Sequence, residues 1–291
     1  MMVGTREIFI KELSDNLGSK RFWLLFFIIY ALGIFMTYGA VQNLGLQRTL
    51  GENVFLQLFV IGAQGLPSFL WVVIYIAPLL GFIFTFDTIN REISSGTLGN
   101  VLSQPVHRDS VINAKFLAGV ATIAITLVGV IFIEIGFAIR AWSTLPTFEE
   151  IGRILIFLLV SVVYLSIWVS LGLLFSVIFR REGTSALASV AVWLFFSFFI
   201  YMIASPLNSL TLLYFSPNYI FLEAAYVLLS PTVRILGPVS IEKLYGMIAT
   251  PLPLDQSLLL VWSHITTLVA VTFIIFAFSY VKFMRQEIRA I

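Results

Sequence analysis

The chain has 291 residues, of which 59% are hydrophobic and only 11% are charged, and its formal net charge is +2. Soluble domains carry about 25% charged residues, so this composition excludes an ordinary soluble protein. The chain has no cysteine, which excludes disulfides and thiolate metal sites. Its two histidines, His107 and His264, are far apart in sequence, so no metal site is expected.

Residues 1–21 are predicted to form an amphipathic helix that lies in the inner membrane interface. Its apolar residues fall within about 100° of helical arc, and charged residues occupy the other side. The apolar residues are Phe9, Ile10, Leu13 and Leu17. Lys20 and Arg21 then lie at headgroup level before the chain enters the membrane. The alternative is an ordinary juxtamembrane tail.

The rest of the chain, residues 22–291, is predicted to be one all-α integral membrane domain with six transmembrane helices. A hydrocarbon core of about 30 Å requires about 20 apolar residues at ~1.5 Å rise each. Helices are expected because backbone polar groups in lipid must be satisfied within the segment, and the apolar stretches do not alternate as barrel strands do. The predicted spans are Phe22–Val41, Ser68–Phe86, Phe116–Ile139, Ile154–Phe179, Thr184–Ala204 and Leu258–Phe283.

Basic residues are distributed unequally between the two sides that six spans define. Twelve of the 17 lysines and arginines lie in the terminal segments and in the second-to-third and fourth-to-fifth connections, and five lie on the opposite side. The positive-inside rule therefore places both termini in the cytoplasm.

The connection between the second and third spans, residues 87–115, is the most informative polar segment. Residues Glu92–Gln104 are predicted to form about three helical turns that Pro105 ends. Asp109 or Ser110 is expected to cap the next helix. This pattern describes either a small rigid platform on the cytoplasmic side or a plain reverse hairpin that joins two spans.

The outer segment between the last two spans, residues 205–257, holds six of the ten prolines. Its stretch Tyr219–Leu229 is apolar and aromatic, and Pro217 and Pro231 flank it. A short helix packed on or dipping into the outer leaflet is predicted there, because proline limits a helix at both ends.

A few residues inside the predicted spans are candidates for a transport pathway. Glu134 is the one acid well inside a span, and a buried charge in lipid is costly. Pro78 interrupts the second span and is expected to kink it. The fifth span is rich in aromatic side chains, among them Trp193, Phe196 and Phe199. The alternative for Glu134 is a carboxyl held by a neighbouring helix or directed to the outer interface, and the aromatic side chains equally suit contact with lipid.

The loop between the second and third spans resembles the first cytoplasmic loop of type-2 permeases of ATP-binding-cassette (ABC) transporters. The matching residues are Glu92, Gly96, Thr97, Leu98, Leu102, Ser103, Pro105, Arg108 and Lys115, in one gap-free spacing. The resemblance extends to the basic N-terminal elbow helix, the six spans, the short loop around Arg180, Arg181 and Glu182, and the proline-rich outer segment with its Leu228-Leu229-Ser230-Pro231 string.

The resemblance implies that the 87–115 loop carries a coupling helix that docks on a separate ATPase subunit. Glu92, Gly96, Thr97, Leu98, Leu102, Pro105 and Arg108 are then the expected contact residues, and Arg180, Arg181 and Glu182 a secondary contact. It also implies two ATPase subunits, a second copy of this permease or a related one, and export across the cell membrane. Membrane lipids surround such a permease, and nucleic acid is not an expected partner.

This chain is not expected to be an enzyme. The phosphate-binding sequence Gly-x-x-x-x-Gly-Lys-Ser/Thr does not occur in it, so no cofactor is expected here, and ATP and Mg²⁺ are expected on the partner ATPase. Two other functions remain open: an ATP-independent carrier or channel, which would need polar groups near the membrane centre, and a membrane scaffold that recruits a soluble protein.

Overall fold

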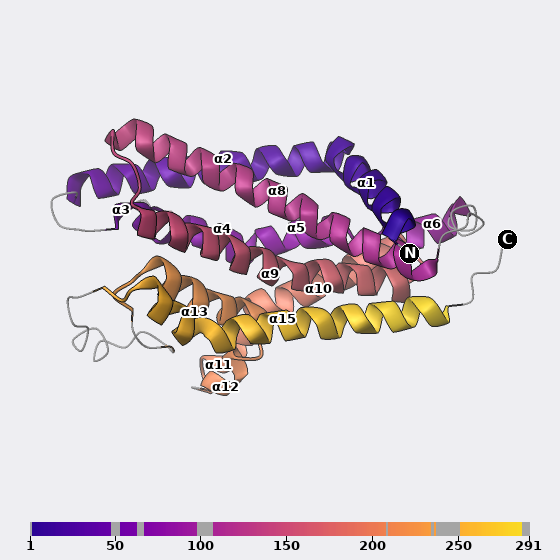
Figure 1. Ribbon diagram of the computed structural model, residues 1–291. Coiled ribbons are helices and arrows are strands. Elements are labelled where there is room, and N and C mark those ends of the chain that lie inside the picture. The colour runs from indigo at the N-terminus through magenta and orange to yellow at the C-terminus, as the bar shows by residue number, and fades with distance from the viewer. Residues whose placement is uncertain are drawn as a thin grey trace.

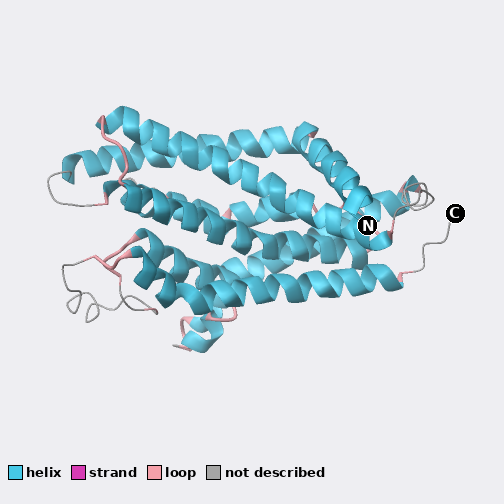
Figure 2. Ribbon diagram, in the orientation of Figure 1, coloured by secondary structure: helices cyan, strands magenta, loops and turns pink. Residues whose placement is uncertain are grey.

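The computed structural model describes residues 2–47, 53–62, 67–97, 107–207, 209–233, 236 and 251–286. Every regular element in these ranges is a helix (Figure 2), which confirms the all-α prediction. The long helices run side by side along one direction (Figure 1). Both described chain ends lie at the same end of this bundle, which we call the termini end, and the opposite end is the far end.

Within the described ranges, five helices are long and apolar enough to cross a membrane, and they match five of the six predicted spans. The fifth span is continuous in path but contains one π-helical turn, η1, between two α-helices. The five are α2 (Lys20–Gln47), α8 (Arg108–Trp142), α9 (Phe148–Ile178), the α10–η1–α11 run (Glu182–Leu194, Phe195–Phe199, Ile200–Ala204) and α15 (Leu254–Arg285).

The remaining predicted span, Ser68–Phe86, is built from two shorter helices, α4 (Phe69–Tyr75) and α5 (Ala77–Ile83). The break lies at Ile76, two residues before the expected kink at Pro78. Proline has no N–H, so the carbonyl of Ile74 loses its normal helical donor, and the helix cannot continue regularly. Together α4 and α5 lead from the far end toward the termini end (Figure 1).

The N-terminal helix α1 (Met2–Gly18) ends at Ser19, where the chain bends into α2. It packs along the first part of α8, as Figure 1 shows. Phe9, Leu13 and Leu17 are partly covered on this helix, whereas Ile10 is exposed. The structure thus confirms a helix at the predicted position. The apolar face of this helix is only partly covered by the rest of the chain.

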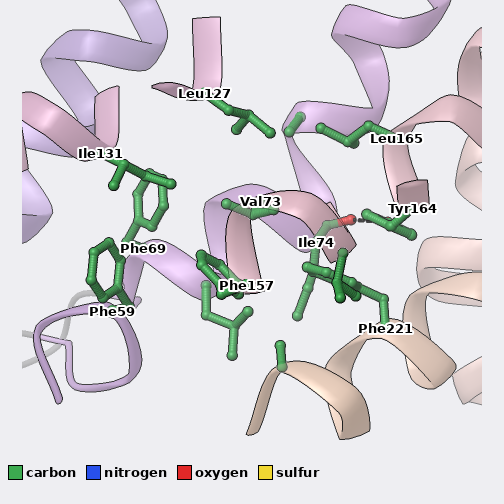
Figure 3. Packing of buried hydrophobic residues seen from close by; sticks show 14 of the residues in the cluster. Phe59, Phe69, Val73, Ile74, Leu127, Ile131, Phe157, Tyr164, Leu165 and Phe221 are labelled. Atoms are coloured by element: carbon green, nitrogen blue, oxygen red, sulfur yellow. Dashed lines mark hydrogen bonds between the residues drawn. The ribbon is translucent and has the colours of Figure 1, made fainter. Parts of the chain in front are cut away.

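Helix α9 is the centre of the bundle and contacts α5, α8, α10, α13 and α15. Its Phe157, Tyr164 and Trp168 side chains are completely buried. Figure 3 shows Tyr164 and Phe157 facing Phe221 of α13, and the rings of Tyr164 and Phe221 stack with centroids 4.3 Å apart. The middle of the bundle is therefore filled by aromatic side chains.

Short helices complete the two ends of the bundle. At the far end are α3 (Val54–Val60) and α13 (Pro217–Leu229), and α12 (Leu210–Leu213) lies at its side. Helix α13 confirms the short helix predicted at Tyr219–Leu229, and it begins with Pro217 in its first turn. At the termini end is α6 (Asn90–Ser94), which follows α5.

Candidate functional site

In its described part, the helix that the sequence predicts over Glu92–Gln104 is interrupted, and residues 98–104 lie outside the described residues. Helix α6 ends at Ser94, and Gly96 has a φ of 71°, in the left-handed region. The Gly96 amide donates to the carbonyl of Ile93 at 3.2 Å, which closes the last turn. A helix commonly stops at such a glycine, so the prediction of one continuous helix through Gly96 is wrong.

The other residues predicted to contact an ATPase are placed in different ways. Leu98, Leu102 and Pro105 lie outside the described residues. Thr97, Arg180 and Arg181 are exposed at the termini end. Arg108 donates from Nη1 to the carbonyl of Gln286 at 3.1 Å, so it links the start of α8 to the end of α15.

Lys115 of α8 is the buried centre of this site. Its side chain is 2% exposed, and its ammonium nitrogen is 2.8 Å from Glu92 Oε1 of α6 and 3.1 Å from Glu12 Oε1 of α1. A buried cation requires such partners because burial removes its hydration. Lys115 therefore joins the polar segment after α5 to the N-terminal helix.

Asp87 is a second buried charge in this site, and it is negative where Lys115 is positive. Its carboxylate is 2.6 Å from the guanidinium of Arg21 in α2 and 2.6 Å from that of Arg91 in α6. Arg91 also lies 3.5 Å from Glu182 at the start of α10. We call the set formed by Glu12, Arg21, Asp87, Arg91, Glu92, Lys115 and Glu182 the ion-pair network.

A hollow of about 380 Å³ opens between these charged side chains at the termini end. Lys11 lines it together with members of the ion-pair network. Burial acts to lower the pKa of Lys11, but the carboxylates of Glu12, Asp15 and Glu92 outweigh it and raise that pKa above its ordinary value. The ammonium group of Lys11 thus stays charged beside the network.

Backbone contacts hold the same segment against α9 and α10. The Ser176 hydroxyl accepts hydrogen bonds from the amides of Ile89 at 2.8 Å and Asn90 at 3.2 Å. The Ser185 hydroxyl donates to the carbonyl of Phe86 at 2.6 Å. Residues 86–94 are therefore fixed to four neighbouring helices, by ion pairs on one side and by serine hydroxyls on the other.

The possible pathway residues do not converge on one cavity in the described part of the chain. Glu134 is buried against α2, where its carboxylate faces Gly33 and neighbours Thr37. Neither oxygen of this carboxylate has a hydrogen-bond partner among the described residues, so the pathway role of Glu134 stays a prediction.

The other pathway candidates surround the break between α4 and α5 or lie on the surface of the bundle. Pro78 is buried there, and the Trp193 indole N–H donates to the Tyr75 carbonyl at 2.8 Å. Phe196 packs edge-to-face on Trp168, and Phe199 is exposed on the outer surface of the bundle. These aromatic residues thus have packing roles within the chain or lie on its surface.

Sequence reasoning missed Arg153 of α9, which it counted only as a charge on the outer side. The Arg153 side chain is completely buried and pairs with Glu149 at 3.0 Å. It also donates to the carbonyls of Leu228 and Leu252 and, at 3.2 Å, to the Ser257 hydroxyl. The Glu149–Arg153 spacing of four residues was the available signal, because such pairs lie on one helix face.

A second polar cluster that sequence reasoning missed links α12, α13 and α15. Glu223 Oε2 is 2.9 Å from His264 Nε2 and 3.1 Å from the Tyr214 hydroxyl. His264 is therefore a hydrogen-bonded residue in the packing between α13 and α15. Both side chains of the Glu223–His264 pair are buried.

A family model described as "ABC-2 family transporter protein" matches residues 6–288. The chain belongs to the ABC-2 transporter family. A search of curated proteins finds no match to this chain. The family match spans all five long helices, the α4–α5 pair and the ion-pair network, so the ABC-2 permease includes every element described above. The chain is accordingly a multi-pass membrane component of a transporter.

Proposed function

We propose that this ABC-2 permease is the membrane subunit of an exporter, driven by separate ATPase subunits that dock on the termini end. The ion-pair network is the observation that supports this most directly. It connects the exposed segment 94–97 to α1 through Glu12, to α2 through Arg21 and to α8 through Lys115. A push on that segment is then transmitted to three helices rather than absorbed by one flexible loop.

The proposed topology has six membrane crossings with both termini in the cytoplasm. The α4–α5 pair provides the sixth crossing beside the five long helices, and an even number of crossings agrees with two chain ends at one end of the bundle. The excess of lysine and arginine at the termini end supports a cytoplasmic orientation in the cell membrane.

We further propose that the working unit contains two permease chains, either two copies or this chain with a related one. The middle of the described bundle is filled by Phe157, Tyr164 and Trp168, so a substrate path through it would have to displace the core. A path between two chains avoids this cost. The fifth span has only 17% of its apolar window buried, which leaves most of that helix available for such an interface.

The energy is proposed to come from ATP and Mg²⁺ bound by the partner subunits, because the sequence lacks the phosphate-binding loop. The resemblance to type-2 permeases supports export as the direction. The role of this chain is mechanical: segment 94–97 receives the force, and Lys115 and Asp87 pass it to the spans.

Site-specific cross-linking tests this proposal directly, because the chain has no cysteine and each introduced cysteine is unique. Thr97→Cys is expected to cross-link to a P-loop ATPase subunit that co-purifies with the permease from its native membrane. Leu145→Cys, on an exposed residue between α8 and α9 at the far end, is the matched control and is expected to give no such product. Equal cross-linking of both variants would contradict docking at the termini end.

The same variants distinguish the alternatives. A membrane-impermeant thiol reagent added outside intact cells is expected to label Leu145→Cys and not Thr97→Cys, and the reverse pattern would overturn the orientation. If the purified permease in vesicles moved a substrate without any ATPase subunit or nucleotide, an ATP-independent carrier would replace the exporter proposal.

A further inference from the structure

A second hollow, separate from the ion-pair network, lies between α1 and α8. Its volume is about 640 Å³, and both helices contribute to its wall. Arg6, Asp109 and Ser110 line one part of it. Phe9 and Leu117 line the rest, together with other apolar residues of α8.

The polarity of this hollow changes along α8. Asp109 is in the first turn of the helix, and Ala121 is 12 residues further on, a distance of about 18 Å at ~1.5 Å per residue. The apolar span of this helix begins at Phe116, and Ala121 lies five residues, or about 8 Å, beyond it. A ligand in this hollow therefore has a polar head outside the hydrocarbon core and an apolar tail that enters the inner part of the bilayer.

The polar end offers one charge of each sign. Among the described residues, Arg6 and Asp109 form no ion pair, although both line the same hollow. A guanidinium is well suited to a phosphate because it donates two parallel hydrogen bonds. A carboxylate beside it suits a primary ammonium group. The two charges together match a phosphate and an amine on one headgroup.

We propose that this hollow binds a phosphatidylethanolamine molecule from the inner leaflet. Arg6 contacts its phosphate, Asp109 accepts from its ammonium group, and one acyl chain lies against Phe9, Leu117 and Val120. The bound lipid then fills the space between α1 and the first turns of α8, next to the turn of α8 that carries Lys115. The inference concerns binding alone and stands whether or not the transport proposal is correct.

Photo-cross-linking in nanodiscs of equal parts phosphatidylethanolamine and phosphatidylglycerol tests the proposal. The probes are the two lipids, each with a photoreactive group on its acyl chain, and the cross-linked residues are mapped by mass spectrometry. The ethanolamine probe is expected to label the α1–α8 hollow about tenfold more than other exposed helix faces, as a difference of ~1.4 kcal/mol gives. Uniform labelling of all lipid-facing helices would overturn the proposal.

Four variants separate the contributions to binding. Ala121→Trp fills the hollow and is expected to remove the preferential labelling, whereas Ala277→Trp, on an exposed alanine of α15, is the matched control and leaves it unchanged. Arg6→Gln is expected to lower labelling by both probes, because both lipids carry a phosphate. Asp109→Asn is expected to lower labelling by the ethanolamine probe alone.

The variants also show what else might occupy the hollow. If Asp109→Asn leaves the preference for the ethanolamine probe unchanged, the proposed headgroup contact is wrong. If Ala121→Trp leaves the preferential labelling unchanged, the labelled lipid does not occupy the hollow and the proposal fails. Asp109→Asn and Arg6→Gln change side chains that are at least partly exposed at the termini end, so both variants are expected to keep the wild-type melting temperature. An unchanged melting temperature shows that a loss of labelling is not caused by misfolding.

Discussion

The hydroxyl of Tyr164 lies 2.8 Å from the carbonyl oxygen of Ile74, four residues before Pro78. This carbonyl is the one that proline deprives of its helical donor. Tyr164 of α9 thus satisfies the polar group that the break between α4 and α5 leaves without a donor, and Figure 3 shows the contact inside the aromatic core. The next carbonyl, that of Tyr75, is satisfied by the Trp193 indole in the same way.

We predict that Tyr164→Phe destabilises the permease by about 1 kcal/mol, because buried hydrogen bonds between membrane helices have about this value. The measurement is thermal unfolding of the purified protein in detergent. Tyr226→Phe, on an exposed tyrosine of α13, is the control and is expected to leave the melting temperature unchanged. A Tyr164→Phe protein as stable as the wild type would mean that water or another donor serves the Ile74 carbonyl.

We predict that Lys115→Met destabilises the termini end more than Glu92→Gln does. Removal of the buried cation leaves the carboxylates of Glu12 and Glu92 facing each other, whereas Glu92→Gln leaves Lys115 paired with Glu12. An effect of about 1–3 kcal/mol is expected for Lys115→Met, since both carboxylates retain some solvent contact.

A double-mutant cycle tests this coupling. Addition of Glu92→Gln to Lys115→Met is expected to restore part of the lost stability, because one of the two facing charges is removed. Lys282→Met, on an exposed lysine of α15, is the control for loss of a basic side chain. Strictly additive effects in the cycle would show that Lys115 and Glu92 do not interact.

We predict that Gly81→Ala destabilises the packing of α5 on α9. A Cβ at Gly81 would lie 2.8 Å from the Cβ of Trp168 and 3.0 Å from the backbone nitrogen of Val169, so the helices must separate. Overpacking of this kind costs about 1–3 kcal/mol. Gly136→Ala in α8 is the matched control, since nothing lies within 4 Å of its added carbon, and it is expected to raise stability slightly. Equal melting temperatures for the two variants would refute the close approach.

The Glu223 cluster predicts a pH dependence of stability. Burial acts to raise the pKa of Glu223, but the hydrogen bonds from His264 and Tyr214 help to outweigh it and leave the pKa below its ordinary value of 4.5. A carboxyl with a lowered pKa contributes stability above the pKa of the unfolded chain and loses it as the pH falls through the folded pKa.

We therefore expect the melting temperature of the wild-type protein to fall as the pH is lowered from the ordinary value of 4.5 toward the folded pKa of Glu223. Glu223→Gln should be less stable near neutral pH and should show a smaller loss over that acid range. Glu7→Gln, on an exposed residue of α1, is the control and should retain the wild-type slope. An unchanged slope in Glu223→Gln would assign the acid sensitivity to other carboxyls.

The sequence predicted the long helices well because their apolar runs are far longer than any competing element requires. Helix α8 extends beyond its predicted span at both ends, and α9 closely matches its predicted C-terminal end. Pro78 correctly indicated a break, which lies at Ile76. The helix predicted through Gly96 failed because periodicity alone gives no weight to the left-handed conformation that glycine allows. Local rules thus located the elements and missed a break within one of them.

The side-chain pairings of the candidate site could not be predicted from the sequence, because they depend on how distant helices pack. Lys115 was recognised as part of a motif, but its pairing with Glu12 depends on α1 folding back onto α8. Arg153 was read as an outer charge, although the fold surrounds it with carbonyls from α13 and from the chain before α15. Such pairings join residues that are distant in sequence, and only packing determines them.

The side chain of Arg153 has a consequence for the whole far end. It fastens the last turn of α13, the chain at Leu252 and the first turn of α15 to a single position on α9. Three parts of the far end therefore depend on one side chain, and its removal would release all three of them at once.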